Sequence, residues 1–248
     1  MDIVMLGFRI FTIFIGLLVG FISYRIFVLS KGSVNSWAYI AFSGFALAGW
    51  AITQALFDGN MLLINISSII GYTAIALSFP IGLVKLNAVF GIKLNKFFST
   101  KIMLTIYGLL LALLLALNFL LIPIENITSK LAAIALFLMG VMSLYASYPS
   151  YKIWKQTGRW FWMFLFTFTV LVGMGLVIET YFGGTCEVDQ EVSEVCEEFS
   201  KHYSGIIPAP AVSEYVDLTP LYYIFHLMLL IGLIFGVAGL YGIRRQFE

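Results

Sequence analysis

Three ionisable residues lie inside long apolar stretches of the sequence and are the first candidates for chemistry. Arg9 lies near the start of the first stretch, Glu179 near the end of the sixth, and His226 near the start of the seventh. An ionisable side chain is costly inside a bilayer, so one that occurs there commonly belongs to a ligand or ion site. We predict a ligand-binding pocket in which Glu179 and His226 approach each other and Arg9 compensates the carboxylate charge.

An alternative for the same three residues needs no pocket. Arg9 would extend to the lipid headgroups, Glu179 would be solvated, and His226 would hydrogen-bond a neighbouring carbonyl group. The pocket hypothesis predicts a site for a small polar ligand, a proton or a metal ion. We assign no metal ligands, because the spans lack several His, Cys or acidic residues that could converge on a metal.

The two cysteines, Cys186 and Cys196, lie in one acidic segment at about 183–219. We predict a disulfide between them on the oxidising side of the membrane, and free thiols if the orientation is reversed. The carboxylates of this segment lack the glycine turn and spacing of a calcium loop, so we expect a solvated face. Two sequons for glycosylation begin at Asn65 and Asn126.

The residue sets that cofactor and catalytic chemistry require are missing. Haem held by two intramembrane histidines is excluded, because His226 is the only histidine within a span. A retinal Schiff base is not expected, because the last span has no lysine between Leu221 and Ile243. The chain has no Cys-x-x-Cys motif, no glycine-rich phosphate loop and no soluble domain for nucleotide work. We therefore predict no catalytic residues, no cofactor and no nucleic-acid partner, and a protein that is not an enzyme.

The elements that position these residues follow from composition. Hydrophobic residues make up 61% of the chain and charged residues 11%, which is far outside the range of soluble domains. In hydrocarbon each span must satisfy its own backbone hydrogen bonds, and uninterrupted apolar runs do so as helices. We predict an all-α integral membrane protein, a single seven-helix bundle over 1–248. The expected spans are Met5 to Phe27, Trp37 to Phe57, Met61 to Lys85, Ile102 to Ile124, Leu131 to Pro149, Trp160 to Phe182 and Leu221 to Ile243.

The charges of the connections predict the orientation in the membrane. Basic residues gather in the connections after the first, third and fifth spans and at the C-terminus, and acidic residues gather on the other side. Short connections rich in Lys and Arg stay in the cytoplasm. We therefore predict a protein of the cell membrane with its N-terminus outside, and this places Arg9, Glu179 and His226 together in the outer third.

A faint internal repeat and paired glycines predict how the spans pack. The segment 23–27 recurs at 150–154 as Ser-Tyr-basic-Ile-aromatic, which suggests a three-plus-one-plus-three plan with the fourth span as connector. Convergence of residues at helix ends would produce the same pattern. Pro80 is expected to kink the third span, and Pro149 to end the fifth. The glycines expected to allow close helix approach are Gly44, Gly49, Gly173, Gly175, Gly236 and Gly239.

Three functions fit these features. The leading hypothesis is a non-enzymatic subunit that packs against other membrane proteins, because polar residues are scarce in the spans and glycines line three of them. The second is a facilitator for transport of a small solute, with a polar pocket in the outer half of the membrane. The third is a sensor that signals through a partner; it is weakened because the chain ends five residues after Ile243 and has no output domain of its own.

Overall fold

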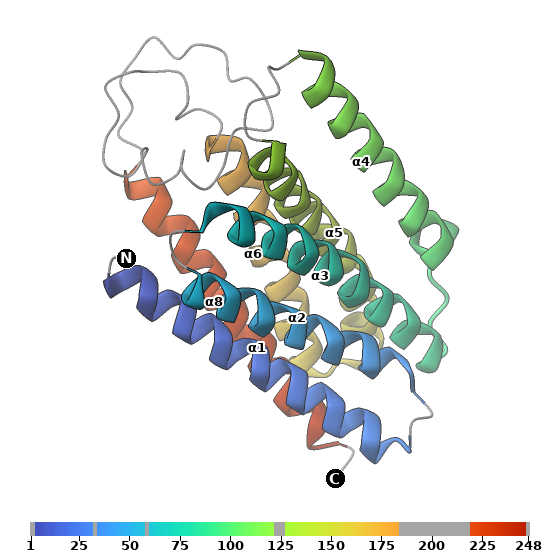
Figure 1. Ribbon diagram of the computed structural model, residues 1–248. Helices are drawn as coiled ribbons and strands as arrows, with labels where there is room; N and C mark the ends of the chain where they lie inside the picture. The colour runs from blue at the N-terminus through green and yellow to red at the C-terminus, as the bar shows by residue number, and fades with distance from the viewer. Residues whose placement is uncertain (1–2, 32–33, 58–59, 122–126, 184–218, 247–248) are drawn as a thin grey trace.

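The computed structural model describes residues 3–31, 34–57, 60–121, 127–183 and 219–246, and everything in these ranges with regular structure is helical (Figure 1). A short 3-10 helix, η1 (Lys96–Phe98), precedes the fourth long helix. The seven α-helices within the described ranges are α1 (Ile3–Leu29), α2 (Ser36–Leu56), α3 (Met61–Val89), α4 (Thr100–Leu121), α5 (Ile127–Thr157), α6 (Trp160–Gly183) and α8 (Thr219–Arg244).

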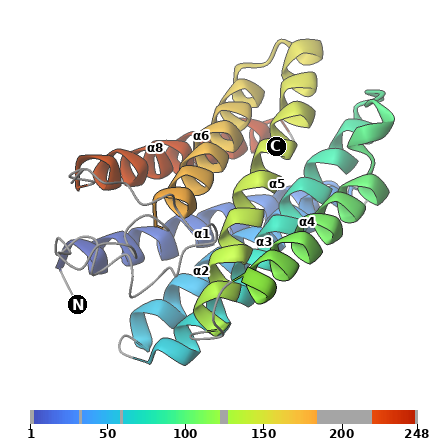
Figure 2. The same cartoon turned by 90° about the horizontal axis from the view of Figure 1, so that it is seen from above.

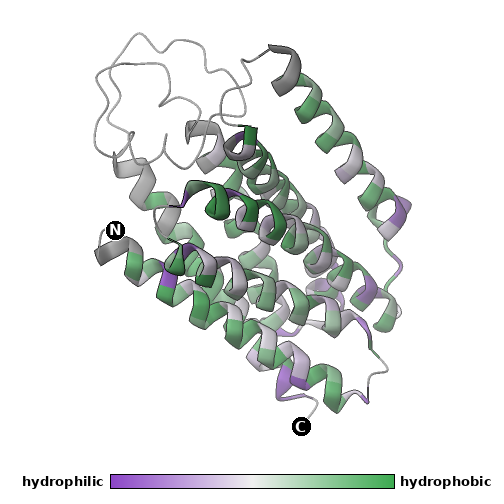
Figure 3. Ribbon diagram, in the orientation of Figure 1, coloured by the Kyte–Doolittle hydropathy of each residue, from purple (hydrophilic) through white to green (hydrophobic). Residues whose placement is uncertain are grey.

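All seven helices are long and apolar enough to cross a membrane. Large apolar side chains also point away from the bundle, as at Phe42 and Leu109, which are 57% and 66% exposed. Figure 3 shows hydrophobic residues along the helices and hydrophilic residues mainly toward their ends. Such a surface is stable against lipid and not against water, so the chain is a multi-pass membrane protein.

Six of the helices form a ring in chain order. Each of α1, α2, α3, α5, α6 and α8 packs against the next, and α8 closes the ring against α1. Helix α4 lies outside the ring, against α5 and the edge of α3 (Figures 1 and 2). We call the end of the bundle where α1 begins the N-terminal end, and the opposite end, where α8 finishes, the C-terminal end.

The expected spans are confirmed as helices, and the boundaries agree within a few residues at most ends. Pro80 lies inside α3, as expected. The prediction that Pro149 ends the fifth span is wrong, because α5 continues eight residues beyond it to Thr157.

The physical reason for the longer α5 is packing around Pro149. Ser150 and Ile153, which follow the proline, are fully buried, so the helical continuation is stabilised by neighbouring helices. Asn87 of α3 donates a hydrogen bond from Nδ2 to the carbonyl oxygen of Pro149 at 3.2 Å. In a bilayer a proline inside a helix is tolerated where neighbours satisfy nearby backbone groups in this way.

Close approach through glycine is confirmed at three of the helix contacts. A Cβ on Gly44 would lie 2.5 Å from the backbone nitrogen of Gly20 in α1. A Cβ on Gly173 would lie 2.8 Å from the nitrogen of Leu144, and one on Gly239 would lie 2.9 Å from the oxygen of Phe161. The same prediction is wrong for Gly49, where a Cβ would meet no atom within 4 Å.

The C-terminal end of the bundle is filled by one hydrophobic cluster that draws on all six ring helices. It includes the late residues of α1, α3, α5 and α8 and the early residues of α2 and α6, all of which lie at that end. Its fully or almost fully buried members include Ile26, Trp37, Leu86, Ile153 and Trp162. We call this set the C-terminal cluster. It closes the ring on that side.

Candidate functional site

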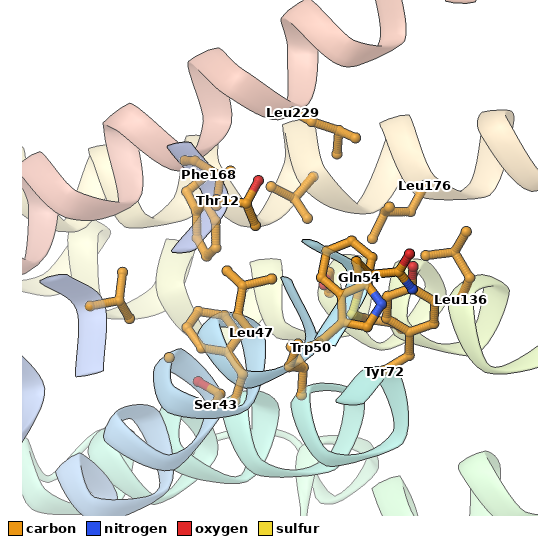
Figure 4. Close-up of a pocket in the computed structure, with 18 of the residues that line it drawn as sticks. Thr12, Ser43, Leu47, Trp50, Gln54, Tyr72, Leu136, Phe168, Leu176 and Leu229 are labelled. Atoms are coloured by element: carbon orange, nitrogen blue, oxygen red, sulfur yellow. The ribbon is translucent and has the colours of Figure 1, made fainter. Parts of the chain in front are cut away.

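A cavity of about 180 Å³ lies within the ring, between the N-terminal end and the C-terminal cluster. All six ring helices contribute to its lining, and the described residues of α4 do not. Phe8 and Arg9 of α1 lie at its N-terminal end, and Phe79 and Phe168 belong both to its lining and to the C-terminal cluster or its immediate contacts. Most of the remaining lining is aliphatic or aromatic (Figure 4).

Among the described residues of the cavity lining, Arg9 is the one that carries a charge, and its predicted role in ligand binding stays a prediction. It is only 9% exposed, and its Nη1 donates to the backbone oxygen of Gln54 at 2.9 Å. Gln54 lies in the last turn of α2, whose final carbonyl groups have no partner within the helix. The guanidinium therefore stabilises the negative end of α2.

A network of uncharged polar side chains joins α2 to α3 beside Arg9. Gln54 Nε2 donates to Ser68 Oγ at 3.0 Å, and Trp50 Nε1 donates to the same oxygen at 3.0 Å. Gln54 is 5% exposed, so the network is shielded from the surroundings. These residues are not among those predicted from the sequence, because only ionisable groups within the spans are candidates there. The signal available was a glutamine and a serine within apolar spans, since polar side chains there commonly bond across helices.

Glu179 and His226 lie in the helical parts of α6 and α8, at the N-terminal end of the bundle. The structure does not describe their side chains, so their approach to each other stays a prediction. Cys186, Cys196 and most of the 183–219 segment lie outside the described residues, as does Asn126. The disulfide, and a glycan at Asn126, also stay predictions.

Asn65 is described, and it is buried. Its side chain is 5% exposed, and its Nδ2 donates to Thr128 Oγ1 of α5 at 3.4 Å. Thr128 is the third residue of the other sequon, so the two sequons meet between α3 and α5. A glycan on Asn65 would require this amide to leave its buried position.

The cavity is suited to holding a small molecule that is mainly apolar. Aromatic rings from four helices border it, from Phe8, Trp50, Tyr72, Phe79 and Phe168. Polar residues of the lining are few and include Arg9, Thr12, Ser43, Gln54 and Ser143, and such groups would orient a bound molecule. Within the described ranges, no three His, Cys, Asp or Glu residues gather as a metal site.

Compared with protein-family models, curated proteins and solved structures, the chain shows no match.

Proposed function

We propose that this protein is a non-enzymatic membrane protein that binds a small, largely apolar molecule inside its helix ring. The observation that carries the proposal is the cavity among six helices, bordered by Arg9 at one end and closed by the C-terminal cluster at the other. A cavity closed at one end favours binding over passage. A facilitator, the second of the sequence-based hypotheses, would have to open the C-terminal cluster during each transport cycle.

The volume of the cavity indicates the size of the molecule. An apolar cavity of about 150 Å³ in a protein core is large enough to bind benzene. The cavity here measures about 180 Å³, so a molecule with one ring, or two small fused rings, fits. Ligand sites of this kind are mainly apolar, with a few polar groups that set orientation.

Helical periodicity supports the predicted grouping of Arg9, Glu179 and His226 at one end of this cavity. Val172 and Leu176 of α6 line the cavity, and Glu179 follows them by seven and three residues. Residues three, four or seven apart share one face of a helix. His226 precedes Leu229 by three residues and Leu233, also of the lining, by seven. Positions 179 and 226 therefore continue the two cavity-lining faces toward the N-terminal end.

Toluene binding to the full chain in mild detergent tests the proposal. Toluene at saturation is expected to raise the melting temperature, followed by circular dichroism, by roughly 3 °C or more, because binding stabilises the folded state. Leu47→Trp, which fills the cavity from α2, should abolish this rise, and Leu233→Phe offers a second filling variant from α8. Phe42→Trp, on the exposed face of α2, is the control and should respond like the unmodified protein. No rise in the unmodified protein would contradict the proposal.

A second candidate function, a subunit of a larger membrane assembly, is favoured by α4. This helix lies outside the ring and touches it along one side only, through residues such as Met103 and Tyr107. Its opposite side is apolar and exposed, with Leu109 and Leu113 among the exposed residues. A partner membrane protein that covers this side should stay bound when the protein is purified in mild detergent. A measured mass that corresponds to one copy of this chain alone would count against a subunit role.

We also propose the orientation with the N-terminus outside the cell. The basic residues described at the C-terminal end of the bundle are Arg25, Lys31, Lys85, Lys93, Lys96, Lys101, Lys152, Lys155, Arg159, Arg244 and Arg245. Several lie against tyrosine rings at the level expected for headgroups, as Lys85 does over Tyr39 at 4.3 Å. Protease added to intact cells should leave the C-terminus uncut. Cleavage at the C-terminus would show that it lies outside the cell and would contradict the proposed orientation.

The three-plus-one-plus-three repeat is proposed on two further observations. Ser23 and Ser150 occupy equivalent places in the repeated segments and are both fully buried, as are Ile26 and Ile153. Under the repeat α1 matches α5 and α3 matches α8, so the contact of α3 with α5 is equivalent to that of α8 with α1, and both contacts occur. An experimental structure in which α1 to α3 did not superpose on α5, α6 and α8 would remove the repeat.

A further inference from the structure

Two hydroxyl groups of the cavity, those of Thr12 and Ser43, donate their protons within their own helices. Thr12 Oγ1 donates to the backbone oxygen of Phe8 at 2.9 Å, within α1. Ser43 Oγ donates to the backbone oxygen of Ile40 at 2.7 Å, within α2. A hydroxyl has one proton to donate and two lone pairs that accept. Toward the cavity, Thr12 and Ser43 therefore offer hydrogen-bond acceptors.

The N–H groups of the Gln54 amide and the Trp50 indole, beside Arg9, also donate to protein atoms. Gln54 Nε2 donates to Ser68 Oγ at 3.0 Å and reaches the backbone oxygen of Ile64 at 3.5 Å. A carbonyl oxygen only accepts, so this contact assigns the nitrogen of the Gln54 amide and leaves Oε1 as an acceptor. The Trp50 N–H is also used by Ser68. Of the other small polar residues in the lining, Ser143 can either donate or accept.

The charge and the shape of the cavity further restrict the chemical class of the ligand. Arg9 carries a positive charge at the N-terminal end of the cavity, which disfavours a protonated amine there. The rings of Trp50 and Tyr72 lie 5.1 Å apart on the lining, and those of Phe79 and Phe168 lie 5.4 Å apart and edge to face. The members of each pair are in contact with each other, so a flat aromatic molecule would pack against the exposed face or edge of a pair.

We propose that the cavity selects a neutral aromatic molecule of one ring, or two fused rings, that carries an N–H or O–H donor. The donor would bond to acceptor oxygens of Thr12, Ser43 or Gln54, while the ring lies among the aromatic side chains (Figure 4). This inference rests on the proposed binding function and adds the chemical class of the ligand. A purely apolar cavity would not favour a molecule with a hydrogen-bond donor over a hydrocarbon of the same shape.

Indole and indene test this inference, because they share one bicyclic shape and indene has a CH2 group where indole has N–H. Calorimetric titration of the purified full chain, corrected with protein-free micelles, should show indole binding at least about fivefold more tightly, which is the effect of one net hydrogen bond. The double variant Thr12→Val with Ser43→Ala should bind the two compounds within about twofold of each other. Thr105→Val with Ser147→Ala is the matched control, since neither position belongs to the cavity lining, and it should keep the preference for indole.

The outcomes distinguish this inference from the proposed function. Equal affinity of the unmodified protein for indole and indene would overturn the donor requirement and leave the binding function standing. Binding of neither compound, together with no response to toluene, would overturn both. If the double variant and the variant Gln54→Met each still bind indole more tightly than indene, the assignment of the acceptor oxygens would be overturned.

Discussion

Replacing Trp162 with alanine is expected to destabilise the protein by about 3 kcal/mol or more, the range for removing a large buried aromatic side chain. Trp162 is 1% exposed and belongs to the C-terminal cluster that closes the ring. Its ring meets that of Phe90 edge to face at 5.4 Å and that of Phe161 at 5.8 Å. Alanine would leave a void within the C-terminal cluster, because the neighbouring side chains can collapse into it only in part. The measurement is the free energy of unfolding from a denaturing-surfactant titration.

Trp160 provides the matched control for Trp162. It lies two residues earlier on α6, but it is 55% exposed. Trp160→Ala removes the same side chain from the periphery of the bundle and is expected to cost about 1 kcal/mol, the loss of its ring contacts with Phe161 and Phe164. Equal losses for the two variants would show that the C-terminal cluster is not the tightly packed end of the ring.

Replacing Gly44 with leucine is expected to cost about 3 kcal/mol, the upper part of the usual range for overpacking. A Cβ at this position would lie 2.5 Å from the nitrogen of Gly20 and 2.9 Å from the oxygen of Gly16. Both are backbone atoms, so no rotamer change relieves the clash and α1 must move away from α2. That movement would also separate Arg9 from the backbone oxygen of Gln54, so toluene binding should be lost with stability.

Gly49 is the control for Gly44, five residues later on the same helix. A Cβ there would meet nothing within 4 Å, so Gly49→Leu adds an apolar side chain on an exposed face. Leucine is also the better helix former, and the variant should stay within about 0.5 kcal/mol of the unmodified protein or gain slightly. Unfolding by surfactant and thermal melting in detergent would both report the difference. Equal stability of the two leucine variants would contradict the close contact of α1 and α2.

The seven helices themselves could be predicted from the sequence, because a bilayer imposes a simple requirement. A span must be apolar over its crossing length and must satisfy its own backbone, and the seven stretches of this chain meet both conditions. Pro149 shows where such reasoning fails. A proline ends many helices by itself, but here the buried Ser150 and Ile153 and the hydrogen bond from Asn87 keep α5 helical. Those contacts come from other helices and are not visible in the local sequence.

Part of the candidate site could likewise be predicted from the sequence, and part depends on the tertiary structure. Arg9 could be identified from its type alone, since an arginine within an apolar span needs an explanation. Its partner, the backbone oxygen of Gln54, could not, because every residue carries that group and only the packing of α1 on α2 selects one. The sequence also could not separate Gly44, which contacts α1, from Gly49, which faces outward.

The sequence by itself determined the seven helices found among the described residues, their approximate ends and the presence of a charge at one end of the bundle. Only the tertiary structure decided that α4 stays outside a ring of six helices and that a cavity remains within that ring. The physical reason is that lipid and protein interior are equally apolar. A span that is apolar on every side does not show which face meets lipid and which meets another helix, and the choice depends on shape complementarity between distant segments.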